Sequence, residues 1–302
     1  MTARVVPGLV ATVILNWNGL ADTIECIHSC QRLAYGQNML LVVDNGSTDG
    51  SVAKLREQFP ELRIIGVGAN LGFAGGCNVG IRAALEAGAE FVWLLNNDTT
   101  VDPAALGELV AALRTRPTVG IAGSKIFYSA RADVMWFAGG AISTRWGYAW
   151  HRGLDEFDIG QHDIVEPCDF ITGCSLLIRS GVVAGIGLMQ ERYFLYWEDV
   201  DWNARAAAAG WRSLYVPTSR VWHKVNSASK DASGEINAKS FRYEVRNRIL
   251  FHRRHYPWRL PRVVLGACRY AMVAGKGAPR RGIAVIRGTI DGLLNRTGAI
   301  RD

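Results

Sequence analysis

The stretch FVWLLNNDTTVDPAAL, residues 91–106, decides the fold that we expect for this 302-residue chain. A run of five large apolar residues stops abruptly at Asn-Asn-Asp (96–98), and Asp102 and Pro103 then begin an apolar pattern with helical spacing. The stretch therefore predicts a buried strand, a polar loop and a helix. Taken alone, the Asn-Asn-Asp loop fits an ordinary turn and a cation-binding site equally well.

Three earlier segments repeat this order of strand, polar loop and helix. Their strands are LVATVIL (9–15), MLLVVD (39–44) and LRIIGV (62–67). Four such units in a row predict an α/β fold with a doubly wound, mostly parallel sheet, and such sheets bind ligands beyond the carboxyl ends of their strands. We therefore expect four polar loops to converge on one rim of the sheet: residues 16–19, 44–51, 68–78 and 96–102.

The second half of the chain has a different pattern. Short, aromatic, glycine-interrupted segments over residues 119–178 predict a small antiparallel portion. A helix is expected from WEDVD (197–201) to Gly210, followed by a strand at 212–217 and then by VWHK.

The charge of the chain is uneven. Residues 239–302 hold 15 Lys and Arg against three acids, a net charge of +12, so the rest of the chain carries −5 of the total of +7. We interpret these residues as a basic, helical C-terminal extension that faces an anionic membrane leaflet rather than nucleic acid. A solvated helical face that covers the body of the protein explains the same charge nearly as well.

Cysteine usage and hydropathy indicate the compartment. The six cysteines are scattered without a CxxC pair, the N-terminus lacks the layout of a signal peptide, and no run of 18 apolar residues exists. This predicts neither a disulfide framework nor a zinc site nor a spanning helix. We expect a cytoplasmic protein, or one resting on the inner face of the cytoplasmic membrane, and leave homodimer formation open.

Two polar segments suit a nucleotide. In VVDNGSTDGS (42–51), Asp44 ends a strand where it can accept an N–H of a base, although an Asx-turn explains the segment better when it is taken alone. GVGANLGFAGGCNVG (66–80) misses the G-x-G-x-x-G spacing by one residue and follows the third strand, which disfavours a dehydrogenase. Its glycines, with Asn70 and Asn78, still allow the backbone to approach a nucleotide sugar closely.

The segment WEDVDW (197–202) places Glu198, Asp199 and Asp201 between two tryptophans at the start of a helix. The helix dipole explains one or two acids there, but not three. Crowded carboxylates in a partly apolar setting raise one another's pKa, which suits a general base.

Two other residues suit a metal ion. Asp98 offers a hard oxygen ligand for Mg²⁺ or Mn²⁺, whose remaining ligands usually come from phosphates and water. His223 in VWHK can complete the shell, although a lone histidine is more often structural.

The chain resembles the inverting family 2 glycosyltransferases with a GT-A fold, in particular their rhamnosyltransferase-like branch. The resemblance is carried, in order over residues 9–224, by VILNWNG, VVDNGSTDGS, NLGFAGGCNVGI, LLNNDTTVDP, FITGCSLLIR, ERYFLYWEDVDW and VWHK. It implies a GT-A catalytic domain over residues 1–238, with a nucleotide-binding half (1–118) and an acceptor-binding, catalytic half (119–238), before the extension at 239–302.

The same resemblance implies roles for individual residues. Asp199 is the expected catalytic base, with Glu198 and Asp201 orienting the base or the acceptor, and Asp98 and His223 bind Mg²⁺ or Mn²⁺. Asp44 recognises the base, and the full set expected to bind the nucleotide sugar is Asn16, Asp44, Asn45, Asn70, Gly72, Phe73, Asn78, Asn96 and Asn97.

One position departs from the family pattern. The metal motif of the family is often Asp-x-Asp, and here its first position is Asn96. The lost carboxylate weakens cation binding, so we expect the metal to arrive largely with the donor diphosphate.

The implied reaction moves a sugar from a nucleoside-diphosphate sugar, dTDP-rhamnose or a UDP-sugar, to a saccharide or lipid-linked acceptor in cell-surface polysaccharide synthesis. The aromatic stretch 136–150 is expected to shape a saccharide site. Two alternatives stay open. A sugar-nucleotide nucleotidyltransferase would want a basic phosphate loop after the first strand, where NWNGLADT has no cation. A non-catalytic nucleotide- or glycan-binding module would not need the carboxylates at 198–201.

Overall fold

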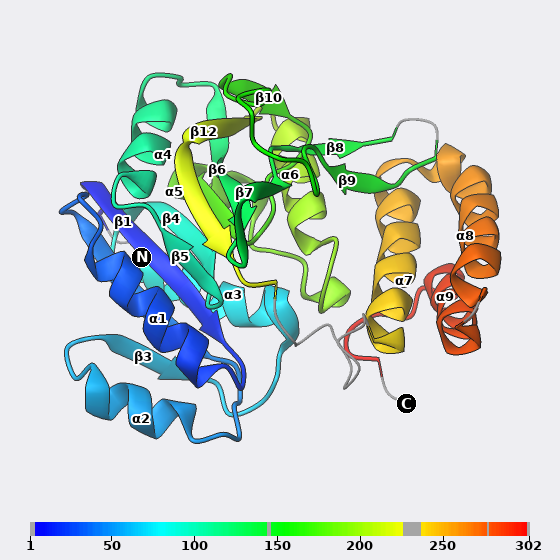
Figure 1. The fold of residues 1–302 in the computed structure, drawn as a ribbon, viewed down its shortest axis with the longest axis horizontal. Coiled ribbons are helices and arrows are strands. Elements are labelled where there is room, and N and C mark those ends of the chain that lie inside the picture. The colour runs from blue at the N-terminus through cyan, green and yellow to red at the C-terminus, as the bar shows by residue number, and fades with distance from the viewer. Residues whose placement is uncertain (1–3, 144–145, 226–236, 277, 301–302) are drawn as a thin grey trace.

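The computed structural model describes residues 4–143, 146–225, 237–276 and 278–300. Figure 1 shows an α/β body and, beside it, three helices formed by the end of the chain. The expected α/β class is confirmed. Residues 226–236, which join the two predicted units, lie outside the described ranges, so the division after residue 238 stays a prediction.

The first half of the chain forms the four expected strand–helix units. Their elements are β1 (Val6–Asn16), α1 (Leu20–Gln31), β2 (Asn38–Asp44), α2 (Ser51–Gln58), β3 (Arg63–Gly66), α3 (Gly72–Glu86), β4 (Ala89–Asn96) and α4 (Ala105–Arg114). The four strands run parallel in the spatial order β3-β2-β1-β4. Because the order reverses after β3, right-handed crossovers place α3 on the opposite face of the sheet from α1 and α2. Such a reversal marks the ligand-binding edge of an open sheet.

The second half extends the same sheet beyond β4. Its elements are β5 (Thr99–Val101), β6 (Val119–Tyr128), β7 (Arg131–Phe137), β8 (Gly140–Ile142), β9 (Ala149–His151), β10 (Glu166–Cys168), β11 (Ser175–Arg179), α5 (Ser180–Ile186), α6 (Glu198–Ala208) and β12 (Arg212–His223). The order continues β4-β11-β6-β12-β10, with β5 and β7 paired to β12 and β6, while β8 and β9 form a separate hairpin.

The pairings among residues 119–178 are antiparallel, as expected: β6 pairs with β7 and β11, and β8 pairs with β9. Beyond this range, β12 runs parallel to β6 and antiparallel to β10 and β5. One expectation for this half needs correction. The strand expected at 212–217 continues to His223 across a register shift between Val216 and Arg220. Pro217 lies in that shift, where its missing N–H costs no ladder bond.

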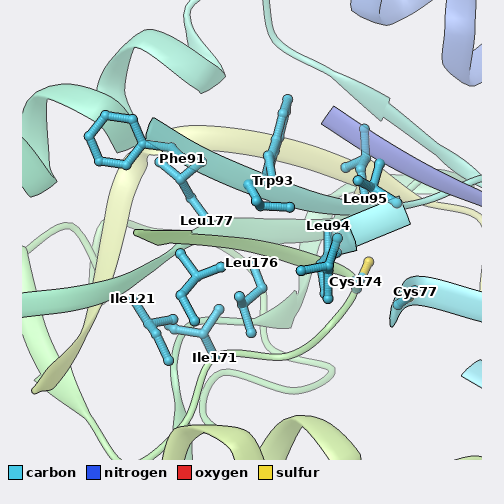
Figure 2. Close-up of a cluster of buried hydrophobic side chains, with 14 of the residues drawn as sticks. Cys77, Phe91, Trp93, Leu94, Leu95, Ile121, Ile171, Cys174, Leu176 and Leu177 are labelled. Carbon is cyan, nitrogen blue, oxygen red and sulfur yellow. The ribbon is translucent and has the colours of Figure 1, made fainter. Parts of the chain in front are cut away.

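The main core lies between the sheet and its helices. Figure 2 shows side chains of β4 and β11 packed together, among them Phe91, Trp93 and Leu177, each fully buried. Strand β4 is covered on both faces, which explains why FVWLL is a continuous apolar run rather than an alternating one.

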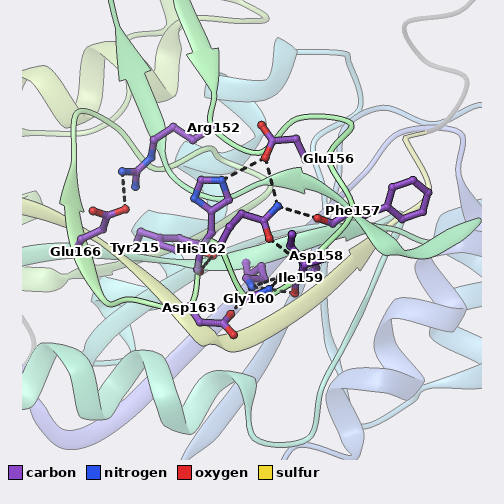
Figure 3. A network of polar contacts seen from close by, with 12 residues as sticks. Arg152, Glu156, Phe157, Asp158, Ile159, Gly160, His162, Asp163, Glu166 and Tyr215 are labelled. Carbon is purple, nitrogen blue, oxygen red and sulfur yellow. Dashed lines mark hydrogen bonds and ion pairs between the residues drawn. The ribbon is translucent and has the colours of Figure 1, made fainter.

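A buried charge fixes the segment between β9 and β10. Lys125 of β6 is fully buried, and its Nζ lies 2.9 Å from Asp158 and 2.6 Å from Asp163. Figure 3 shows the neighbouring network, in which Arg152 pairs with Glu166 at 2.7 Å. A paired cation of this kind holds the segment over the sheet, because losing either partner would leave a buried charge uncompensated.

The basic extension forms α7 (Ala238–His255), α8 (Leu260–Gly275) and α9 (Pro279–Leu293). These helices share an apolar cluster that includes Val245, Val263 and Val285, and Phe251 of α7 also belongs to the main core. No helix within the described ranges has the length and hydropathy needed to cross a bilayer.

Helix α7 holds the loop that precedes α6. Phe194, Tyr196 and Trp197 have φ values of 66°, 69° and 73°, a left-handed conformation that is costly for aromatic residues. The side-chain amide of Asn247 donates to the carbonyls of residues 193, 195 and 196 at 2.9, 2.7 and 2.8 Å. The strained loop therefore persists because a fully buried amide of the extension satisfies its carbonyls.

Replacing Asn247 with Ala should lower the free energy of unfolding by roughly 1–3 kcal/mol, since buried carbonyls lose their donor. Urea unfolding followed by fluorescence measures the change. Arg253→Ala, an exposed position on the same helix, is the matched control and should stay near wild type. Equal stability of the two variants would contradict the role of Asn247.

Candidate active site

Side chains at the ends of β1, β2 and β4 are joined by hydrogen bonds. Asn16 Nδ2 donates to Asp44 Oδ2 at 2.7 Å, and Asn97 Nδ2 donates to Asn16 Oδ1 at 3.4 Å. Asn45 Nδ2 reaches Asn70 Oδ1 in the loop after β3 at 3.2 Å. The four polar loops therefore converge on one rim, as expected. Asn16 is fully buried and its amide is used within the rim, so it shapes the rim, and its expected contact with the nucleotide sugar stays a prediction.

The loop after β3 closes against the loop before α6. Gly72 has φ of +75°, and a Cβ there would lie 2.4 Å from the carbonyl oxygen of Phe194, so no other residue fits. The next amide, Phe73 N, donates to the same oxygen at 2.6 Å. Asn70 Oδ1 accepts from Gly72 N at 2.8 Å and sets the turn. Gly72 and Phe73 thus connect the rim formed by the four polar loops to the strained loop before α6.

Asn78 lies elsewhere. Its buried amide exchanges hydrogen bonds with the backbone of Met189 and reaches Glu191 Oε1, each at about 3 Å. Asn78 thus holds residues 189–191 on α3, and its expected part in nucleotide binding stays a prediction.

Asp98 and His223 meet at the rim although they are 125 positions apart. Strand β12 pairs with β5, which brings His223 Nε2 to 3.1 Å from Asp98 Oδ1 and 3.5 Å from Asn96 Nδ2. Burial alone would lower the pKa of His223, but its contacts with Cys174 and Asp98 raise it to about 10. Burial also raises the pKa of the Cys174 thiol.

This pair fits part of a divalent-metal site. A carboxylate oxygen and an imidazole nitrogen face one another, and a metal ion between them would have to displace the proton of His223. The opposite nitrogen of the ring, Nδ1, is buried without a hydrogen-bond partner among the described residues. Within the described ranges, no group of three or more His, Cys, Asp or Glu side chains could hold an ion. Two protein ligands are the number that Mg²⁺ commonly takes when substrate phosphates and water supply the rest.

Asp199 lies in the first turn of α6 and is partly exposed. Its Oδ2 accepts from Gly173 N at 2.9 Å and its Oδ1 from Val200 N at 2.7 Å. Burial raises the pKa of Asp199, and these hydrogen bonds limit the rise. A carboxylate that is held in place with a raised pKa is suited to act as a general base.

The segment at 172–174 joins Asp199 to the Asp98–His223 pair. Gly173 binds the carboxylate, while the Cys174 carbonyl accepts from Asn96 N at 3.0 Å and its thiol contacts His223. Sequence reasoning used FITGCSLLIR only as a family landmark and missed this role. The Gly-Cys pair after a polar Thr was the available signal.

The other two acids of the cluster separate in the structure. Glu198 is 4% exposed, and its Oε2 has no hydrogen-bond partner in the described part of the chain. Burial, followed by the charges of Asp199 and Asp201, raises the pKa of Glu198 well above the usual value. Burial and then the nearby Glu198 raise the pKa of the Cys77 thiol of α3. Glu198 therefore adjoins Asp199 without the fixed partners that Asp199 has.

Asp201 points to the opposite side of α6. Its Oδ2 accepts from Arg205 at 2.8 Å and its Oδ1 lies 2.8 Å from His255 Nε2 of α7. Burial alone would raise the pKa of Asp201, but hydrogen bonds from His255 and Arg205 lower it. Asp201 therefore fastens α6 to α7, and its expected role in orienting the base or the acceptor stays a prediction.

Several known proteins are similar to this chain. Residues 7–246 match the family described as "Glycosyltransferase like family 2". The N-acetylglucosaminyl-diphospho-decaprenol L-rhamnosyltransferase of Mycobacterium tuberculosis (strain ATCC 25618 / H37Rv) is 31% identical over 218 residues, which cover 66% of this chain and 71% of the relative.

Two solved structures share the fold. GalNAc-T7 with UDP, GalNAc and Mn²⁺ has a TM-score of 0.67 at 14% identity, and the match covers 96% of this chain and 55% of that protein. The mannosyltransferase PcManGT from Pyrobaculum calidifontis, in complex with GDP-Man and Mn²⁺, has a TM-score of 0.57 at 16% identity, over 95% and 87% of the two chains.

Proposed function

The chain belongs to glycosyltransferase family 2, and from that premise we propose that it moves a sugar from a nucleoside-diphosphate sugar to a saccharide or lipid-linked acceptor during cell-surface glycan synthesis. The observation that carries the proposal is the connection of Asp199, through Gly173 and Cys174, to the Asp98–His223 pair. It supports a reaction in which Asp199 is the base and the Asp98–His223 pair holds a metal ion at the diphosphate. The rhamnosyltransferase relative favours dTDP-rhamnose as donor over a UDP-sugar.

In the proposed reaction, Asp199 takes the proton of an acceptor hydroxyl as its oxygen attacks the anomeric carbon. The bond from that carbon to the diphosphate oxygen breaks on the opposite side, so the anomeric configuration inverts and a nucleoside diphosphate leaves. Gly173 N–H keeps the carboxylate of Asp199 in place, and its raised pKa makes it a stronger base. When bound by Asp98 and His223, Mg²⁺ or Mn²⁺ would neutralise the charge on the leaving diphosphate.

The nucleotide is expected on the rim formed by the loops after β1 to β4. Asp44 and Asn45 are buried at the end of β2, next to Asn70 and the Gly72 turn. In the proposal Asp44 recognises the base, and backbone at Gly72 and Phe73 approaches the sugar closely. Asn96 and Asn97 support the Asp98 loop from either side.

Asp199→Asn should leave donor binding nearly intact and reduce turnover by about 10²–10⁴, because the amide cannot accept the proton. Release of nucleoside diphosphate measures turnover, and NMR of the wild-type product reports the anomeric configuration. Asp155→Asn, the same change in an exposed loop, is the control. Near-normal turnover of the Asp199 variant, or a retained configuration, would refute the mechanism.

The metal should bind tightly only with the nucleotide, because Asn96 removes one carboxylate and Asp98 already pairs with His223. Isothermal titration of Mn²⁺ should give weak binding to the protein alone and much tighter binding with dTDP or UDP present. Asp98→Asn should abolish the difference. Tight Mn²⁺ binding without nucleotide, or full activity in excess EDTA, would contradict this.

The exposed faces of α8 and α9 support membrane contact. Eight apolar side chains there are 40–67% exposed: Leu265, Met272, Val273, Ile283, Ile286, Ile290, Leu293 and Leu294. Residues 257–300 hold eight Lys and Arg and one acid, Asp291, which is buried between Arg242 and Arg296. A face that is apolar, cationic and without an exposed acid suits an anionic lipid surface and would repel a second copy of itself.

The variant Met272→Glu with Ile286→Glu should lose co-sedimentation with phosphatidylglycerol vesicles, which the wild type should bind in preference to phosphatidylcholine vesicles. The added acids oppose both the apolar and the electrostatic attraction. Ile159→Glu, at an exposed position of the body, serves as the control. Equal sedimentation with both lipids would refute membrane contact, and a dimer dissolved by the double variant would identify the face as a subunit interface.

A further inference from the structure

A cavity of about 410 Å³ lies between the β8–β9 hairpin and helices α7 and α8. Figure 1 shows the hairpin reaching from the body towards these helices. Trp146 and Tyr148 line the cavity from the hairpin, Arg248 and Glu244 from α7, and Arg269 and Tyr270 from α8. None of these residues belongs to the site formed by Asp98, Asp199 and His223.

The cavity contains a guanidinium group whose donors are not all used. Arg248 is 6% exposed, its Nη2 donates to the Val263 carbonyl at 3.2 Å, and its Nε has no hydrogen-bond partner among the described residues. A buried cation with an unused donor is costly in an empty site and is satisfied by an anion. Gly266 lies against the same guanidinium, since a Cβ there would be in van der Waals contact with Arg248 Nη2 at 3.4 Å.

The charges of the cavity favour an anion. Arg269 is exposed at its mouth, with its guanidinium 5.6 Å from the centre of the Trp146 ring. Glu244 is the one acid in the lining, and burial raises its pKa while Arg248 lowers it. Two guanidinium groups against one carboxylate leave a net positive site, and guanidinium groups bind phosphate oxygens in a bidentate manner.

The remaining lining suits a sugar. Trp146, Tyr148 and Tyr270 offer aromatic faces, on which the apolar faces of a sugar ring can pack while its hydroxyls remain available for hydrogen bonds. The cavity therefore joins a surface for a saccharide to a pair of cations for phosphate.

The position of the cavity connects it to catalysis. Glu244 accepts a hydrogen bond from the side chain of Trp197, the residue immediately before Glu198 and Asp199. One wall of the cavity is thus continuous with the strained loop that presents the base. Helix α8 carries both Arg269 and three of the exposed apolar residues, Leu265, Met272 and Val273.

We propose that this cavity binds the phosphate-bearing part of a phosphate-linked saccharide acceptor, with Arg248 and Arg269 on the phosphates and the aromatic side chains against the sugar. The inference rests on the proposed function in that it takes the ligand to be the acceptor. It names a recognition site for the phosphate, which would distinguish a lipid-diphosphate-linked sugar from a neutral glycan.

The test uses a short-chain alkyl diphosphate ester of N-acetylglucosamine and the matching neutral alkyl glycoside, each titrated calorimetrically into the full chain. The wild type should bind the diphosphate ester more tightly than the neutral glycoside. Arg269→Gln should weaken binding of the ester roughly tenfold or more and leave the glycoside unchanged, since only the ester uses the charged contact. Arg287→Gln removes the same charge from an exposed position of α9 and is the matched control.

The outcomes distinguish a phosphate-linked acceptor from a lipid headgroup as the source of phosphate. They also distinguish failure of the cavity site from failure of the proposed function. No binding of the ester at about millimolar concentration, or equal losses for Arg269→Gln and Arg287→Gln, overturns the cavity assignment. Loss of vesicle binding in Arg269→Gln with unchanged ester binding assigns the cations to lipid headgroups instead. Calorimetric titration needs no turnover, so ester binding that depends on Arg269 upholds the cavity site even if the protein consumes no donor. Normal donor turnover, together with ester binding that Arg269→Gln leaves unchanged, overturns the cavity site and leaves the proposed function standing.

Discussion

The amide of Asn247 is the contact on which the site depends, because it stabilises a backbone that would otherwise not persist. Three aromatic residues in the left-handed region turn the chain sharply into α6, so that Glu198 and Asp199 come at the very start of the helix. Arg246 supports the same loop by donating to the Tyr193 carbonyl at 2.9 Å. Strain of this kind is stable only where the surroundings satisfy the backbone completely, and here those surroundings belong to the C-terminal extension.

The extension is therefore more than a charged surface. Asn247 and His252 of α7 are fully buried, His255 binds Asp201, and Arg242 binds Asp291 inside the helical group. Asn247 and His255 thus fix α7 to the body, Arg242 fixes α7 to α9, and α8 and α9 keep exposed apolar side chains outward. The extension holds the strained loop before α6, and it carries the faces for which we propose lipid and phosphate contacts.

The rim on the other side is built from amide–carboxylate contacts rather than from free acids. Asn16 is shared between Asp44 and Asn97, so the ends of three strands behave as one unit. Asp98 is left to pair with His223, and Asn96 contacts the same ring. A site with one carboxylate would take the remaining negative charge from a substrate, which is why we propose that a metal ion arrives with the donor diphosphate.

The sequence by itself determined the four strand–helix units and the convergence of their loops, because apolar periodicity and polar strand ends are local signals. It could not show that Asp98 meets His223, or that Asn78 and Asp201 contact distant segments. Nor could it show that Asn247 and Arg248 are buried, because they stand in a basic run typical of a solvated surface. Only the tertiary structure decided these roles. Hydrogen bonding of buried polar groups depends on which segments meet, and pairings such as β5 with β12 or α6 with α7 leave no pattern within either segment.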